Sequence, residues 1–273
     1  MIPAGFGYAR AASTAEALAL LAEHGDEAKL LAGGHSLLPL MKLRLAQPEM
    51  LIDLGEVSDL SYIEFRNDHV AIGAMTRHRD VERSTVLAAQ APLIAHAASQ
   101  VGDPQVRNRG TIGGSLAHGD PASDLPSVAL ASGASMVVRG PGGERVVAAA
   151  DFFTGFLETA VGPDELLTEI RFPVAAGEGW SFQKFNRRAQ DWAIVGASVQ
   201  AGPSGGVALV NMGPSPMISA AATEALRSGA SPADVGAAAA DEAEPTGDIH
   251  ADAAYRRHLA RVLVERAVTE ARA

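Results

Sequence analysis

The first sixty residues contain one helical hydrophobic pattern followed by two short apolar runs. Ser13 and Glu16 have the spacing of a capping box, and the leucines after them recur at helical intervals, so a helix is expected over about 14–24. The apolar runs at 29–31 and 50–54 are too short for helices and predict buried strands. This alternation indicates a small βαβ-like unit.

From about residue 60 the pattern changes to hairpins interrupted by helices. The turns at 67–68 and 141–143 each separate two short apolar runs, which is typical of antiparallel hairpins. Helical patterns fall at 77–83, 92–100 and 125–132, and a strand closed by proline is expected at 165–173.

Alanine-rich sequence follows a short linker at 175–179. Strands are expected at 180–187, 193–201 and 207–212, and helices at 217–228, 231–241 and 252–271. Because the strands come first and the helices after, this segment is expected to form its own α+β unit. We therefore predict two domains, 1–176 and 177–273, and divide the first into lobes of about 1–56 and 57–176.

Composition narrows the class of protein. The chain has 273 residues, is 47% hydrophobic and carries a formal charge of −10, so nucleic acid is not the expected partner. It contains no cysteine, which excludes disulfides and cysteine-ligated iron–sulfur clusters within the chain. No stretch has the ~20 unbroken apolar residues of a membrane span, and the start shows no signal-peptide pattern, so a cytoplasmic protein is expected.

Two segments rich in small residues follow apolar runs and resemble ligand-binding loops. The first is Leu30–Leu38, which contains Gly33 and Gly34, and the second is Arg107–His118. We call them the first and second cradle. Glycine allows a ligand to approach the main chain, and consecutive backbone N–H groups can then converge on an anion. Two cradles in one chain suggest one long, phosphate-bearing ligand.

Other motifs give weaker signals. There is no G-x-G-x-x-G and no Walker lysine motif, so neither a Rossmann nor a P-loop site is supported. Gly202–Gly206 matches G-x-S-x-G, but its proline and the strand after it favour a hairpin turn over a nucleophile elbow. The eight histidines lack metal-ligand spacing, and no metal site is expected. His35 and His118 differ from the others because they lie in the cradles.

Both cradles, followed by Asp120–Pro126, the Phe182–Arg188 strand and the Asp252–Ala260 segment, closely resemble the FAD-binding medium subunit of the molybdenum hydroxylases of the carbon monoxide dehydrogenase and xanthine dehydrogenase family. The resemblance implies a two-lobed FAD-binding (PCMH-type) domain followed by a small α+β C-terminal domain. It also implies non-covalent FAD, no metal in this chain, and a heterotrimer or its dimer with an iron–sulfur small subunit and a molybdenum large subunit.

The function that the resemblance implies is to take electrons from the iron–sulfur clusters of a partner subunit and pass them through FAD to an external acceptor. No residue of this chain is expected to be catalytic. The cofactor-binding residues expected from the cradles and the resemblance are Ala32, Gly33, Gly34, His35, Ser36, Leu37, Thr111, Gly113, Gly114, Ser115, Asp124, Leu167, Lys184, Asp191 and Trp192.

Several of these residues have alternative interpretations. Asp124 precedes an apolar helical run, so it is also expected to be a helix N-cap. Lys184 would ordinarily be a solvated lysine of a strand, but the resemblance places it beside the flavin, where a cation would stabilise an anionic reduced state. Trp192 replaces a tyrosine of many relatives, and it either stacks on the flavin or packs in a core.

Two functions of other classes compete with the medium subunit. One is a self-contained FAD-dependent reductase of the UDP-N-acetylenolpyruvoylglucosamine reductase type, which acts on a cell-wall precursor. Such a reductase needs a proton donor beside the flavin, and no serine or glutamate here can be assigned that task. The other is a nucleotide-binding scaffold without redox function, which would be colourless.

Overall fold

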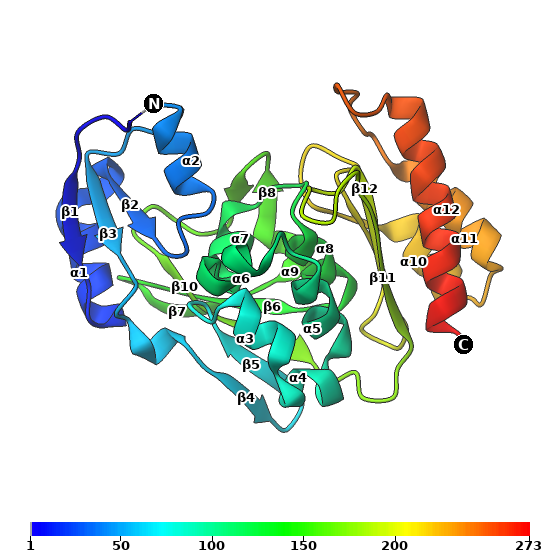
Figure 1. The fold of residues 1–273 in the computed structure, drawn as a ribbon. Coiled ribbons are helices and arrows are strands. Elements are labelled where there is room, and N and C mark those ends of the chain that lie inside the picture. Colours follow the sequence, from blue (N-terminus) through cyan, green and yellow to red (C-terminus); the bar gives the residue numbers. More distant parts are fainter. Residues whose placement is uncertain (1) are drawn as a thin grey trace.

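The computed structural model describes residues 2–273 and arranges them around three larger sheets placed side by side (Figure 1). The first sheet has the order β1-β3-β2, and its strands run parallel. It is built from β1 (Gly7–Arg10), β2 (Ala28–Leu31) and β3 (Met50–Asp53), with α1 (Thr14–His24) and α2 (Leu37–Lys42) as connections. The expected βαβ-like unit is present. The sequence did not predict β1, because this strand contains no apolar run.

Helix α1 has the predicted limits and the predicted cap. The Ser13 hydroxyl accepts a hydrogen bond from the N–H of Glu16 at 3.2 Å, and the Glu16 carboxylate accepts one from the N–H of Ala12 at 2.8 Å. Gly25 ends the helix with a φ of 52°, which suits glycine. The capping box therefore fixes where the chain turns before β2 carries it to the first cradle.

The second sheet is antiparallel, with the order β4-β5-β10-β6-β7. Its strands are β4 (Ile63–Arg66), β5 (His69–Gly73), β6 (Ser135–Gly140), β7 (Gly143–Ala148) and β10 (Leu166–Pro173). Both predicted hairpins, β4–β5 and β6–β7, are present, and Asn67 turns the first with a φ of 51°. A two-stranded sheet of β8 (Phe153–Gly155) and β9 (Glu158–Thr159) lies beside it.

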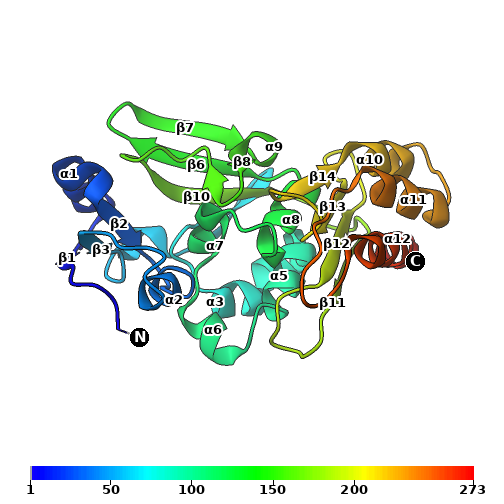
Figure 2. The same ribbon diagram turned by 90° about the horizontal axis from the view of Figure 1, so that it is seen from above.

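Helices cover one face of this second sheet, as Figure 2 shows from above. They are α3 (His78–Arg83), α4 (Thr85–Gln90), α5 (Pro92–Ser99), α6 (Pro104–Arg109), α7 (Ile112–His118) and α8 (Asp124–Ala131), and the short α9 (Ala149–Phe152) follows β7. The patterns at 77–83, 92–100 and 125–132 correspond to α3, α5 and α8. The second cradle is correspondingly not a loop, since most of it forms α6 and α7.

The third sheet is an antiparallel meander with helices on both faces. Its strands, in sheet order, are β11 (Trp180–Phe185), β12 (Val195–Gln200), β13 (Val207–Val210) and β14 (Met217–Ser219). Helices α10 (Ala220–Arg227), α11 (Pro232–Glu242) and α12 (Ala253–Ala271) lie toward the C-terminal side, while α5 and α8 pack on the opposite side (Figure 1). This explains why every residue of β12 and β13 is buried.

The helix expected at 217–228 begins three residues later than the pattern predicts. Residues 217–219 form the edge strand β14, and the helix begins only at Ala220, where the Ser219 hydroxyl caps it through the N–H of Ala222. Met217 and Ile218 are apolar enough to extend the helical pattern, but pairing with β13 satisfies their backbone instead.

The C-terminal segment shares a core with the middle of the chain. Phe182 of β11, Ala208 and Val210 of β13 belong to the same buried cluster as α5, α8 and the second sheet. A separate cluster joins the opposite face of the third sheet to α11 and α12. The third sheet is thus packed from both sides, which fixes the loop between β11 and β12 relative to the central helices. The domain limits at 56 and 176 stay predictions.

No helix within residues 2–273 is long and apolar enough to cross a membrane.

Candidate functional site

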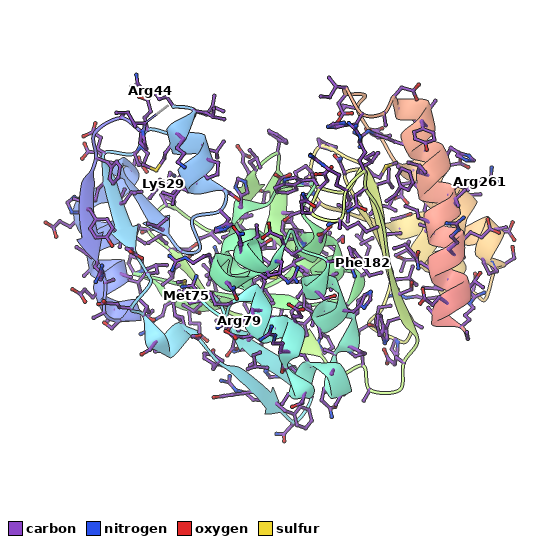
Figure 3. All side chains as sticks on the ribbon, viewed as in Figure 1. Lys29, Arg44, Met75, Arg79, Phe182 and Arg261 are labelled. Carbon is purple, nitrogen blue, oxygen red and sulfur yellow. The ribbon has the colours of Figure 1, made fainter. Side chains whose placement is uncertain are left out.

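A cavity of about 880 Å³ lies between the three sheets, a volume that suits a large cofactor. Its wall combines the first cradle, α7, the start of α8, β10, and the loop between β11 and β12. Two side chains labelled in Figure 3 mark its surroundings: Met75 packs in the core of the first lobe, and Phe182 packs in the central core. Every residue of the expected cofactor-binding set lines this one cavity.

The first cradle presents a row of free hydrogen-bond donors. Within the described part of the chain, the backbone N–H groups of residues 33–37 donate to no protein acceptor, and these residues all line the cavity. Gly34 has a φ of 74°, which lets the backbone curve around the ligand space. Successive N–H groups of this kind form a concave site for an anion such as a pyrophosphate.

The His35 side chain closes back on the first cradle. Its Nδ1 lies 2.9 Å from the carbonyl oxygen of Gly33, and because a carbonyl can only accept, Nδ1 carries the proton in this contact. His35 therefore braces the turn at Gly33, and its Nε2 is left as the free ring nitrogen.

The second cradle is built differently from the sequence-based expectation. Thr111 caps α7, and the first N–H groups of that helix are already used inside the protein. The pairs are Ile112 N to Thr76 O (3.0 Å), Gly113 N to Ala74 O (2.9 Å), Gly114 N to Thr111 Oγ1 (3.1 Å) and Ser115 N to Thr111 O (3.1 Å). Residues 112–115 therefore do not form a backbone anion site, and the polar groups they offer are hydroxyls. The Ser115 and Ser123 oxygens lie 3.1 Å apart on the cavity wall.

Two glycines of the cradles are required by close packing. A Cβ at Gly33 would come within 2.6 Å of the carbonyl oxygen of Arg109 and 2.7 Å of the Cα of Gly110. A Cβ at Gly113 would come within 2.4 Å of the Cβ of Ala74. The first glycine lets the two cradles meet, and the second lets α7 lie against the end of β5.

Asp124 and Lys184 form a buried ion pair at the cavity. The Lys184 Nζ lies 2.6 Å from the Asp124 Oδ2 and also donates to the carbonyl of Gln100 at 3.0 Å. The two side chains are 6% and 7% exposed. The other carboxylate oxygen of Asp124 is buried without a hydrogen-bond partner, although buried carboxylates normally use both oxygens.

This pairing corrects the prediction that Asp124 is an N-cap. Ser123 occupies the N-cap position of α8, and Asp124 is the first residue within the helix. Its side chain turns toward Lys184 because that contact supplies a buried counter-charge, which a cap position would not. Lys184 is correspondingly not a lone cation beside the ligand space.

Burial raises the pKa of Asp124 to about 6, and the neighbouring Lys184 acts in the opposite direction. Burial also lowers the pKa of His78 to about 4, so its imidazole is neutral at physiological pH. His78 lines the cavity beneath Gly110, and its Nδ1 is buried without a partner. His78 could not be singled out from the sequence, since its helix carries no motif.

The loop between β11 and β12 forms the remaining wall. The carboxylate of Asp191 accepts hydrogen bonds from Arg188 at 3.0 Å, and Trp192 beside it is 55% exposed. The core alternative for Trp192 is therefore wrong, and its ring belongs to the rim of the cavity. Leu167, on β10, is buried in the opposite wall next to a bulge of that strand.

Other wall residues escaped the sequence-based expectation. They come from the β8–β9 region, the loop after it and the start of β10, where Leu157, Thr159, Val161 and Leu166 line the cavity. The glycines of this region, Gly155 and Gly162, stand apart and do not follow an apolar run as Gly33 and Gly34 do, so the region gives little signal for a ligand site. Across residues 2–273, no group of three or more His, Cys, Asp or Glu side chains is placed to hold a metal ion.

Comparisons with known families agree with this architecture. Residues 4–175 match the family model of the FAD binding domain in molybdopterin dehydrogenase, and residues 180–271 match the carbon monoxide dehydrogenase flavoprotein C-terminal domain. The chain belongs to the FAD-binding medium subunits of the molybdenum hydroxylases, as the sequence-based resemblance predicted.

Individual relatives within this family match nearly the whole chain. The carbon monoxide dehydrogenase medium chain of Hydrogenophaga pseudoflava is 43% identical over 99% of this chain and 98% of its own length. The solved carbon monoxide dehydrogenase structure from that organism superposes with a TM-score of 0.94 at 44% identity, covering 99% of this chain and 98% of the matched one. Quinoline 2-oxidoreductase from Pseudomonas putida 86 gives 0.90 at 31% identity, covering 99% and 98%. These relatives favour the medium subunit, an oxidoreductase flavoprotein, over the stand-alone reductase.

Proposed function

We propose that this cavity holds one FAD and that residues 33–37 bind its pyrophosphate through their backbone N–H groups. The row of free N–H groups in the first cradle supports this proposal, because no acceptor within residues 2–273 takes a hydrogen bond from them. The cavity volume of about 880 Å³ suits a ligand of this size. At the N-terminus of α7, Thr111 and Ser115 offer hydroxyl contacts to the cofactor. Gly113 and Gly114 have no side chains, so the helix backbone itself forms the cavity wall there.

The far end of the cavity suits the flavin and its ribityl chain. The unpartnered oxygen of Asp124 is an acceptor for a hydroxyl or N–H of the cofactor, and Lys184 holds that carboxylate in place. Trp192 offers an aromatic face at the rim, and Leu167 offers an apolar wall. Asp191 shapes the loop through Arg188.

FAD, when bound, supplies the electron-accepting and electron-donating chemistry, and the chain's residues position it and exclude water. We infer that the electrons come from iron–sulfur clusters of a small partner subunit and leave to an external acceptor. The chain has no cysteine to ligate such a cluster itself. Relatives of this chain are named for substrates as different as carbon monoxide and quinoline. We therefore infer that the substrate chemistry belongs to a large molybdenum subunit and not to this chain.

The assembly is proposed to be a heterotrimer or its dimer, located in the cytoplasm. The relatives named as medium chains support partner subunits, and the net charge of −10 agrees with a partner other than nucleic acid.

The experiment that tests the cofactor site compares FAD with riboflavin, which lacks the pyrophosphate and the adenosine attached to it. Charge-assisted hydrogen bonds contribute about 1.5–3 kcal/mol each, so losing two of them weakens binding at least about 100-fold. We expect calorimetry to show one FAD per chain, riboflavin binding weaker by at least that factor, and displacement of FAD by ADP. Equal affinity for FAD and riboflavin would remove the pyrophosphate from residues 33–37.

A further inference from the structure

Arg256 is a buried charged residue outside the cavity wall. It lies on α12, which runs alongside β11 and β12 (Figure 1), and it is 2% exposed. One guanidinium nitrogen donates to the carbonyl of Ile194, and the other donates to the Asp248 carboxylate at 2.6 Å. The third nitrogen, Nε, is buried without a partner.

Ile194 is the last residue of the loop that carries Trp192. The N–H of Ile194 donates to the carbonyl of Phe185 at 2.8 Å, which closes the loop over residues 186–193 at its base. The Asn211 amide donates to the carbonyl of Ala193 at 3.0 Å from the other side. Arg256 and Asn211 therefore anchor the last two residues before β12, immediately after Trp192.

The third element at this junction is the segment before α12. The Asp248 carboxylate accepts the N–H groups of His250 and Ala251 at 2.8 and 3.0 Å, which folds this segment onto itself. Arg256 then ties the folded segment to the loop through its two outer nitrogens. A guanidinium is suited to this task because its rigid fork reaches two acceptors at once, whereas an ammonium acts as a point charge.

Burying a guanidinium against one half-exposed carboxylate gives little net stability, so stability alone does not account for this arrangement. We propose that Arg256 is a positioning residue for the cofactor site, fixing the 186–194 loop so that Trp192 stays at the rim of the cavity. This inference rests on the proposed function for the meaning of the rim, but the anchoring itself is independent of FAD.

The two tryptophans of the chain make the loop observable. In a Trp180→Phe background, Trp192 is the sole tryptophan, and time-resolved anisotropy of the full chain without FAD reports its local motion. We expect Arg256→Met to increase the fast, local component at least two-fold and, in the FAD-loaded chain, to speed FAD release about ten-fold. Arg256→Lys should give an intermediate result, since the ammonium reaches one acceptor.

The matched control is Arg257→Met, because Arg257 is the next residue of α12 but is exposed, and its side chain donates to the carbonyl of Ala243 rather than to the 186–194 loop. It should leave both measurements unchanged. Asp248→Asn weakens the ion pair but keeps an oxygen acceptor for the N–H groups of His250 and Ala251. It takes the place of Arg256→Met if that variant does not fold, and it should change both measurements in the same direction. Unchanged Trp192 anisotropy in a folded Arg256→Met or Asp248→Asn chain would overturn the inference. Absence of FAD binding in the parent would instead contradict the proposed function and leave the anisotropy result valid.

Discussion

The Lys184 ammonium lies 2.6 Å from the Asp124 carboxylate, although Lys184 belongs to β11 and Asp124, sixty residues earlier, to α8. Both are buried, and the pair joins the start of α8 and the end of α5 to β11. Its net charge is zero when both groups are ionised. The pair therefore stabilises negative charge on a neighbouring ligand much less than a single cation would.

This pairing makes the two single variants unequal in their effect on the flavin reduction potential. In Lys184→Met, the pKa of Asp124 rises further because its counter-charge is lost, so the carboxyl takes up a proton and the site stays neutral. In Asp124→Asn, the Lys184 cation is left unpaired. We expect a change below about 10 mV in the first and an increase of about 30 mV, equivalent to about 1.4 kcal/mol for two electrons, in the second.

Redox titration of the FAD-loaded variants at pH 7 measures both shifts. The double variant Lys184→Met with Asp124→Asn is the control, because it removes the pair while keeping the site neutral, and it should match the parent. A large decrease in Lys184→Met would show that the lysine acts on the flavin as a lone cation.

FAD affinity should depend on pH through Asp124. In the free chain the pKa of this carboxyl is about 6, and a hydrogen bond from the cofactor to its free oxygen favours the ionised form, so its pKa is lower in the complex. Binding then releases a proton. The affinity is highest above pH 6 and falls by up to about ten-fold per pH unit below it.

Fluorescence titration of FAD between pH 5 and 8 checks this sign. Asp124→Asn keeps an oxygen acceptor but cannot titrate, so its affinity should be flat over this range. A parent affinity that rises on acidification would contradict the assignment of the acceptor to Asp124.

Gly33→Ala should separate the two cradles. The new Cβ would meet backbone atoms of Arg109 and Gly110 at 2.6 and 2.7 Å, which neither cradle can avoid by a side-chain rotation. Overpacking of this kind costs about 1–3 kcal/mol, so the free energy of unfolding should fall by that amount and FAD affinity about ten-fold. Gly142→Ala is the control, since no atom lies within 4 Å of its Cβ position and no change is expected. Denaturant unfolding and calorimetry give both quantities, and equal results for the two variants would refute the packing argument.

The FAD should be held without a covalent bond. The chain has no cysteine, and the His35 ring makes a hydrogen bond from its Nδ1 to the carbonyl of Gly33 in its own cradle. Acid precipitation should leave the yellow chromophore in the supernatant. Colour retained in the protein pellet would indicate a covalent link.

Local sequence predicted those parts of the fold that local chemistry determines. The capping box at Ser13 placed α1, and apolar runs bounded by turns placed the hairpins, because these signals act over a few residues. The second cradle was misjudged for a physical reason. Glycine has a low helix propensity, so Thr111-Ile112-Gly113-Gly114 resembles a loop. The helix forms because Thr111 caps it and because Gly113 packs against Ala74, a contact distant in sequence.

The candidate site shows the same division. Gly33 and Gly34 stand out because a short apolar run leads directly into them. The partner of Asp124 could not be predicted, since Ser123 and Asp124 are both good capping residues and only the fold brings Lys184 near one of them. The burial of Arg256 could not be predicted either, because an arginine on an amphipathic helix is usually solvated, and α12 carries several.

The proposed transfer of electrons from the partner subunits to the FAD of this chain is tested most directly by reconstitution. The purified chain, free of other subunits, is loaded with FAD, and the absorbance of the flavin is followed after adding carbon monoxide, an aldehyde or an N-heterocycle. We expect no substrate-dependent reduction by the chain alone, and rapid reduction with the complex's own substrate once the iron–sulfur and molybdenum subunits are added. Rapid substrate-dependent reduction by the isolated chain would contradict this proposal.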